Sequence, residues 1–144
     1  SVNCRRILRA ENFRGSEIRR RLFDNYLDWI LDFRRDIFPY FTQWIDGSFV
    51  TQKLNPNDLD FVTFLDGRVF EINEKRKELD RFWSFSNEDK GLDAYLLAEV
   101  EPEDPNFADF AHFKNVWAKR YSNGDKGDNL HTIRKGFIQI VFEK

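Results

Sequence analysis

The stretch that decides the fold is WIDGSFVTQKLNPNDLDFVTFL, residues 44–65. Short apolar runs lie at its two ends, at residues 44–45 and 61–65, and both runs are typical of buried strand ends. The polar residues gather between them, where the first run stops and the second begins. The stretch therefore predicts two strands whose adjoining ends carry phosphate or metal chemistry.

Two aspartates, Asp58 and Asp60, begin the second of these strands, which we predict over residues 58–65. Strand alternation puts both on one face, with Leu59 and Phe61 on the other. Like charges so close together are unfavourable unless a cation lies between them. Oxygen ligands without a nearby Cys or His favour Mg²⁺ or Mn²⁺ over Zn²⁺. We therefore expect a divalent metal here, although an isolated Asp-x-Asp is more often only a solvated pair.

The Gly47-Ser48 turn precedes the aspartates. Gly47 can adopt a positive φ and lets a ligand approach the backbone, while Ser48 adds a hydroxyl where a short helical turn over residues 49–52 would begin. Free N–H groups at such a point suit a phosphate. Alone, the dipeptide is also compatible with an ordinary turn, so its significance depends on its distance from the acids.

The rest of the chain alternates helical and strand patterns within a single expected domain, residues 1–144, whose first 15 residues form an extended basic arm. We predict helices from Ser16, as the N-cap, toward Pro39, then over residues 69–83 and 107–121. Further strands are predicted over residues 40–46, 92–100 and 135–142. This order favours an α/β or α+β fold with a mixed sheet of about four strands packed by helices.

Composition limits the class of protein. The net charge of −2 provides no global attraction to nucleic acid, although a local patch stays open. The single cysteine, Cys4, forms no intrachain disulfide, and no run approaches the roughly 20 apolar residues of a membrane span. No apolar secretion signal is visible, so the cytoplasm is the simplest location. Most of the 16 phenylalanines, with Trp44, Trp83 and Trp117, should fill the core.

Several other polar residues are weaker candidates. Lys53, Arg134 and Lys135 are basic residues that would contact a phosphate, but each also fits a solvated surface charge. His112 and His131 have no metal partner at a suitable spacing, and Cys4 has no local base, so we expect no catalytic role for them.

The pattern Gly-Ser, nine residues, then Asp-Leu-Asp between two apolar strands resembles the signature of the polymerase-β-like nucleotidyltransferase superfamily. The resemblance implies that Gly47 and Ser48, with Lys53 nearby, hold nucleotide phosphates. It implies that Asp58 and Asp60 bind two Mg²⁺ or Mn²⁺ ions. It also implies a third acid on a later, adjacent strand, and Asp93 is the position that matches.

More of the chain is similar to a small bacterial family of nucleotidyltransferase-like proteins of uncharacterised function, through WIDGSFVT, the PNDLD motif and the closing strand over residues 135–140. In size it is also similar to minimal nucleotidyltransferases that serve as antitoxins and transfer AMP to a partner toxin. The resemblance implies transfer of a nucleoside monophosphate, as AMP from ATP, to a hydroxyl of a protein, nucleic acid or small molecule.

Two other hypotheses stay open. Because the chain is short, it would also suit a catalytically weak or inactive binding module, such as an antitoxin that occludes a partner toxin. A plain α/β domain with a fortuitous motif is the third reading.

Overall fold

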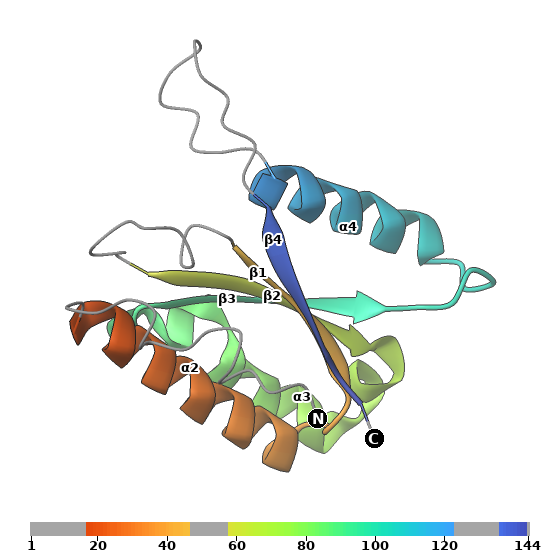
Figure 1. Ribbon diagram of the computed structural model, residues 1–144. Coiled ribbons are helices and arrows are strands. Elements are labelled where there is room, and N and C mark those ends of the chain that lie inside the picture. Colours follow the sequence, from red (N-terminus) through yellow and green to blue (C-terminus); the bar gives the residue numbers. More distant parts are fainter. Residues whose placement is uncertain (1–16, 47–57, 123–135, 144) are drawn as a thin grey trace, which may run out of the picture.

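The computed structural model describes residues 17–46, 58–122 and 136–143. One four-stranded sheet lies at its centre, in the order β3-β2-β1-β4 (Figure 1). Strands β2 and β3 are parallel, and β1 is antiparallel to both β2 and β4. The fold is therefore α+β with a mixed sheet, as predicted. The strands are β1 (Phe41–Asp46), β2 (Leu59–Asp66), β3 (Leu92–Glu99) and β4 (Phe137–Phe142).

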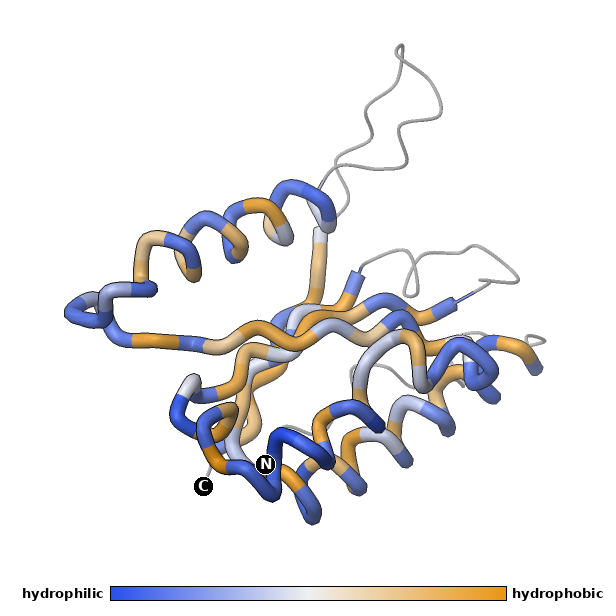
Figure 2. Tube along the Cα trace, turned by 180° about the vertical axis from the view of Figure 1, so that it is seen from behind, coloured by the Kyte–Doolittle hydropathy of each residue, from blue (hydrophilic) through white to orange (hydrophobic). Residues whose placement is uncertain are grey.

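Helices cover both faces of this sheet, with α2 (Glu17–Asp36) and α3 (Asn73–Leu79) on one face and α4 (Phe107–Ser122) on the other (Figure 1). The alternation of β2 explains the two faces. Phe61 packs in the core under α2, whereas Val62 and Phe64 pack in a second core under α4. Figure 2 shows the result as apolar strands between helices whose residues alternate in hydropathy. Asp60, on the same side of the strand as Val62, therefore belongs to the α4 face.

Helix α2 confirms the long amphipathic helix predicted before Pro39. Its apolar face buries an aromatic series, in which the rings of Trp29 and Phe33 stack with centroids 4.7 Å apart. The indole N–H of Trp29 donates a hydrogen bond to the carbonyl of Phe82 at 3.1 Å. A buried polar N–H is thereby satisfied, and α2 is tied to the connection between β2 and β3.

The single helix predicted over residues 69–83 is wrong. A 3₁₀ helix, η3 (Gly67–Glu71), begins where the Asp66 side chain accepts a hydrogen bond from the backbone N–H of Arg68. Ile72 then takes an extended conformation and is 45% exposed, so it interrupts the helical period. Helix α3 and three short 3₁₀ helices follow: η4 (Asp80–Phe82), η5 (Ser84–Ser86) and η6 (Glu88–Lys90). Local capping and an extended residue outweighed the apolar spacing.

The other boundaries differ little from the prediction. Strand β2 begins at Leu59, so Asp58 lies immediately before the strand instead of in it. Helix α4 and strand β3 confirm the predicted elements to within one residue at each end. The predicted arm over residues 1–15 and the helical turn over residues 49–52 lie outside the described residues. Within the described ranges, no helix has both the length and the hydropathy needed to cross a membrane.

Candidate metal centre

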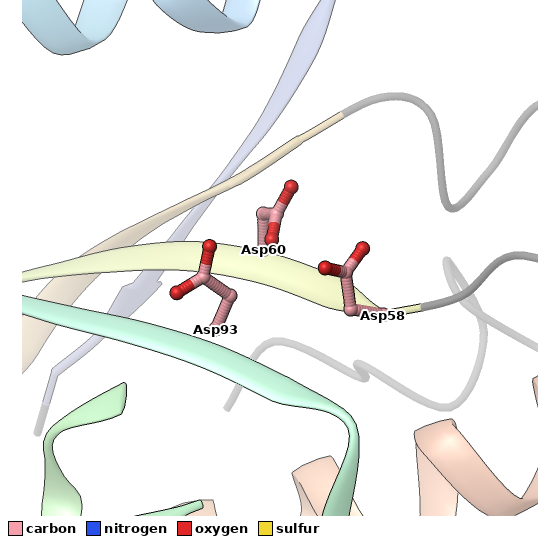
Figure 3. Close-up of side chains that lie close together, drawn as sticks. All are labelled: Asp58, Asp60 and Asp93. Carbon is pink, nitrogen blue, oxygen red and sulfur yellow. The ribbon is translucent and has the colours of Figure 1, made fainter. Parts of the chain in front are cut away.

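Three of the predicted acids meet at one end of the parallel strand pair. Asp60 and Asp93 are the second residues of β2 and β3, and the register places them directly opposite each other. Asp58 precedes β2 and points to the same side (Figure 3). One carboxylate oxygen from each residue lies within 4.8 Å of those of the other two. The sequence therefore predicted correctly that Asp58 and Asp60 are neighbours, and Asp93 does lie on the adjacent strand.

Asp60 is the central acid of the cluster and is only partly accessible. Its Oδ1 atom is buried and has no hydrogen-bond partner among the described residues. Burial, and then the negative charge of Asp58 and the contact with Asp93, raise the pKa of the Asp60 carboxyl to about 8. Burial disfavours the charged form, and like charges disfavour it further. A cation at this point would relieve both effects.

A fourth acid, Asp46, lies beside the cluster at the end of β1. The antiparallel register pairs Ile45 with Phe61, so Asp46 follows one step along the ladder toward Asp60. Asp46 is only 6% exposed, and its charge also contributes to the raised pKa of Asp60. The sequence pattern indicates Asp46 only as the end of a predicted strand. Asp46 lies two residues after Trp44, which is buried on the α4 face, so strand alternation predicts that Asp46 lies on the same face as Asp60.

Ser84 fixes the third acid. Its hydroxyl donates a hydrogen bond of 2.6 Å to Oδ1 of Asp93, from the 3₁₀ helix η5. Such a bond to a ligating carboxylate orients it and limits its rotamers. No local pattern in the sequence marks Ser84, because its position depends on the broken connection that replaced the predicted helix.

Tyr121 of helix α4 lies on the face of the sheet that carries the cluster, and it is fully buried. Its ring contacts that of Trp117, with centroids 5.5 Å apart, and its hydroxyl has no hydrogen-bond partner among the described residues. Burial, and then the charges of Asp60 and Asp46, raise the pKa of the Tyr121 phenol well above its usual range. The phenol therefore stays neutral and retains a proton to donate. The sequence indicated only that Tyr121 belongs to the apolar face of a helix.

The remaining predicted site residues do not enter this geometry. Gly47, Ser48 and Lys53 lie outside the described residues, as do the candidate phosphate contacts Arg134 and Lys135. Cys4 and His131 also lie outside them. His112 is exposed on α4, with its ring 5.6 Å from that of Phe113. Trp44 is buried, and Trp83 and Trp117 are half-buried beside the two cores.

A separate groove of about 920 Å³ lies at the opposite end of the same strands. It is bounded by the last residues of β2 and β3 and by the first half of α4, and none of the three clustered acids lines it. Its lining mixes aromatic side chains, including Phe64, Phe110 and the half-exposed Phe113, with charged residues of both signs. The acidic cluster and this groove are therefore two distinct surfaces.

Comparison with known proteins places the chain in a family without assigning it an activity. The model of a family of unknown function, DUF6932, matches residues 5–141. No curated protein matches the chain, and no solved structure does. Because the match extends over nearly the whole chain, the protein belongs to the DUF6932 family of unknown function.

Proposed function

We propose that this protein is a metal-dependent nucleotidyltransferase that moves a nucleoside monophosphate, AMP from ATP in the simplest case, to a hydroxyl group. The observation that carries the proposal is the carboxylate cluster of Asp58, Asp60 and Asp93, gathered within 4.8 Å from two parallel strands. A purely structural cluster of carboxylates would normally include a Lys or Arg side chain that neutralises it. A buried oxygen of this cluster, Oδ1 of Asp60, has no hydrogen-bond partner in the described part of the chain.

The donor set fits Mg²⁺ or Mn²⁺. All three ligands are carboxylates, which hard divalent cations prefer, and no described His or Cys joins them. The buried and unpartnered Oδ1 of Asp60 is an acceptor that such an ion would satisfy. Asp58, Asp60 and Asp93 would hold the metal, and we propose two ions, as the superfamily resemblance implies. When bound, the ions would neutralise negative charge on the phosphates and on the attacking oxygen.

The chain's own residues have separate roles in the proposed reaction. The acceptor hydroxyl oxygen bonds to the α-phosphorus, the bond from that phosphorus to the leaving oxygen breaks, and pyrophosphate departs. Asp93, held by Ser84, is the carboxylate that we propose takes the hydroxyl proton. Gly47, Ser48 and Lys53 would contact the β- and γ-phosphates, as the resemblance implies.

The polymerase-β-like fold is part of the same proposal. Two features support it: a parallel strand pair with acids at matching positions, and helices on both faces of a mixed sheet. The Gly-Ser turn comes before the acid-bearing strand, as in that superfamily.

The direct experiment incubates the protein with labelled nucleotide, Mg²⁺ or Mn²⁺ and candidate acceptors, including a partner protein. The Asp58→Ala/Asp60→Ala double variant should abolish transfer. As a control, Asp24→Ala/Asp28→Ala removes the same charge from exposed positions on α2 and should leave transfer unchanged. Transfer that persists in the Asp58/Asp60 variant would refute the proposal.

A second candidate function is a binding module, such as an antitoxin that occludes a toxin. The groove at the far end of the sheet favours it, together with Phe113 and Val116, which are 50% and 45% exposed on α4. Exposed apolar side chains beside a groove are typical of protein-binding surfaces. Neutralisation of a partner that survives Asp58→Ala/Asp60→Ala but is lost in Phe113→Asp would support this function over catalysis.

A further inference from the structure

The hydroxyl of Tyr121 is a polar group that the described part of the fold does not use. Tyr121 has no exposed surface, and its oxygen has no hydrogen-bond partner among the described residues. Its ring packs against Trp117, a contact that phenylalanine would make equally well. Buried hydroxyls are normally paired, because an unpaired one is unfavourable. The tyrosine hydroxyl therefore makes no hydrogen bond within the described residues, and a group from outside them, such as a ligand, could complete one.

The surroundings of this hydroxyl indicate the kind of ligand. Asp60, Asp46 and Asp93 are all close enough for their charges to act on the phenol, yet none is hydrogen-bonded to it. A neutral phenol is a good donor to an anionic oxygen. An anion can approach these acids only with a cation that neutralises them. A phosphate that arrives as a metal complex meets both conditions.

The neighbouring residue on α4 adds positive charge at the same place. The guanidinium of Arg120 lies over the ring of Trp117, 4.9 Å from its centroid, and 5.6 Å from the centroid of Tyr95. The two rings are themselves in contact, with centroids 4.6 Å apart. Stacking on two aromatic rings restrains a long side chain. The last turn of α4 thus presents a donor and a cation opposite the acids of the sheet.

We propose that the Tyr121 hydroxyl donates a hydrogen bond to a phosphate oxygen of the metal-bound triphosphate, so that α4 forms the wall of the site opposite β2 and β3. This role rests on the proposed function, since the phosphate reaches Tyr121 only with the metal. It makes Tyr121 a substrate-positioning residue, distinct from the acids that hold the ions.

The test is a calorimetric comparison of two ligands, Mn²⁺ alone and a preformed complex of Mn²⁺ with inorganic tripolyphosphate, which avoids any question of base preference. Tyr121→Phe keeps the ring and removes only the oxygen. It should bind Mn²⁺ within about twofold of wild type and bind the tripolyphosphate complex about tenfold more weakly or worse, as expected for a lost hydrogen bond to a charged group.

The matched control is Tyr26→Phe. The Tyr26 hydroxyl is also buried, but it donates to Oε1 of Gln43 at 2.5 Å, inside the core. This variant should melt at a lower temperature and bind the tripolyphosphate complex as wild type does. Tyr121→Phe should melt at or above the wild-type temperature, because it removes an unpaired hydroxyl.

Several outcomes would overturn the inference. Unchanged binding of the tripolyphosphate complex by Tyr121→Phe would do so, and so would an equal loss of affinity for Mn²⁺ alone, which would assign the hydroxyl to the ion site. A lower melting temperature for Tyr121→Phe would show that the fold uses the hydroxyl. If wild type binds neither ligand, the proposed function fails, and this inference fails with it.

Discussion

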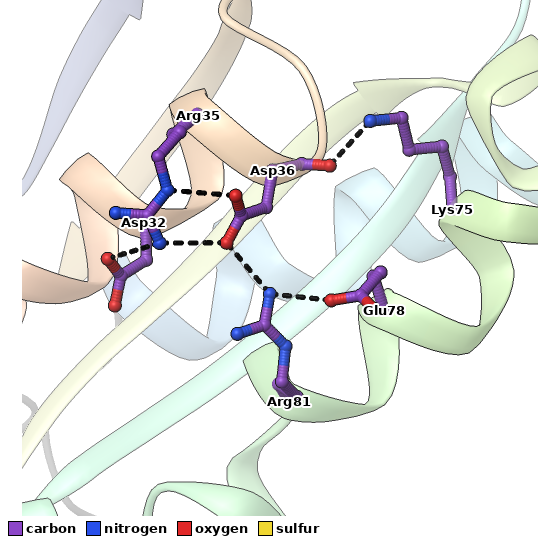
Figure 4. Close-up of polar contacts among 6 residues, drawn as sticks. All are labelled: Asp32, Arg35, Asp36, Lys75, Glu78 and Arg81. Atoms are coloured by element: carbon purple, nitrogen blue, oxygen red, sulfur yellow. Dashed lines mark hydrogen bonds and ion pairs between the residues drawn. The ribbon is translucent and has the colours of Figure 1, made fainter.

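Asp36 and Asp60 are both partly accessible aspartates with charged neighbours, but their neighbours differ in sign. Asp36 ends α2 and accepts hydrogen bonds from Arg35 Nε at 2.8 Å and from Arg81 Nη2 at 2.9 Å (Figure 4). These two arginines hold the pKa of Asp36 well below its usual range. Asp60 is surrounded by acids, and burial and those acids raise its pKa to about 8. Among the described residues, arginines supply the countercharge for Asp36, whereas the buried Oδ1 of Asp60 has no hydrogen-bond partner.

We propose that the difference in neighbouring charge distinguishes a structural cluster, around Asp36, from a ligand site, around Asp60. The Asp36 group joins α2 to the segment that follows β2: Arg81 bridges Asp36 and Glu78, and Lys75 donates to the Asp36 carbonyl at 2.6 Å (Figure 4). It is complete within the chain. In the proposed metal centre, a bound cation would supply the countercharge that Oδ1 of Asp60 lacks among the described residues, and the protein would accept some loss of stability for it. The following predictions test this contrast, from the largest expected effect to the smallest.

Asp60→Asn should stabilise the metal-free protein. At pH 8 the substitution removes a partly buried charge that stands next to Asp58 and Asp93. Relief of that repulsion should raise the free energy of unfolding by on the order of 2 kcal/mol. Urea denaturation with a chelator present measures this free energy. If Asp60→Asn were less stable than wild type, the carboxylate of Asp60 would not be destabilising the metal-free protein.

The stability of the metal-free protein should also fall as the pH rises from about 4 to about 8. The folded state raises the pKa of Asp60 from its ordinary value of 3.8 to about 8, so in this interval the folded protein binds more protons than the unfolded chain. Stability then decreases with pH and levels off above about 8. Melting curves with chelator at unit steps of pH check the slope, which should be smaller in Asp60→Asn. An unchanged slope in that variant would assign the pH dependence to other groups.

Ser84→Ala should weaken Mn²⁺ binding about tenfold, because it frees the Asp93 carboxylate that the Ser84 hydroxyl orients. Ser86→Ala is the matched control. The Ser86 hydroxyl lies in the same 3₁₀ helix but donates to the Asp80 carbonyl. Calorimetric titration of both variants distinguishes orientation of the ligand from disturbance of the helix. Equal losses in the two variants would contradict an orienting role.

Asp36→Asn should have the smallest effect and the opposite sign to Asp60→Asn. It removes favourable pairing at an exposed edge, where salt screens the interaction, and should lower the melting temperature by only about 1 to 3 °C. Differential scanning calorimetry at low and high salt measures this. If Asp36→Asn melted at a higher temperature than wild type at low salt, the arginines would not be stabilising the carboxylate.

Much of the fold follows from periodicities that the sequence displays directly. The alternation after Asp58 correctly placed Asp60 opposite Leu59 and Phe61, and the helical spacing before Pro39 identified α2. The helix expected over residues 69–83 failed because Ile72 is extended, which no apolar period encodes. Ser84 was missed for the same reason, since it reaches Asp93 only through the broken connection.

The candidate site divides in the same way. Asp58 and Asp60 are two residues apart in sequence, so the alternation of extended backbone is enough to place them on one side. Asp93 was identified through the resemblance, and its approach depends on the parallel pairing of β2 and β3. Tyr121 comes from another element on the opposite side of the site, and single-sequence periodicity identifies its ring as core without indicating where its hydroxyl lies.

The most direct test of the central claim is a calorimetric titration of Mn²⁺ at pH 8 into wild type, Asp60→Asn and Asp36→Asn. If the cluster around Asp60 is a cation site, wild type and Asp36→Asn should bind Mn²⁺ alike, and Asp60→Asn should bind it at least about 100-fold more weakly. Equal binding by all three proteins, or no binding by wild type, would contradict the account.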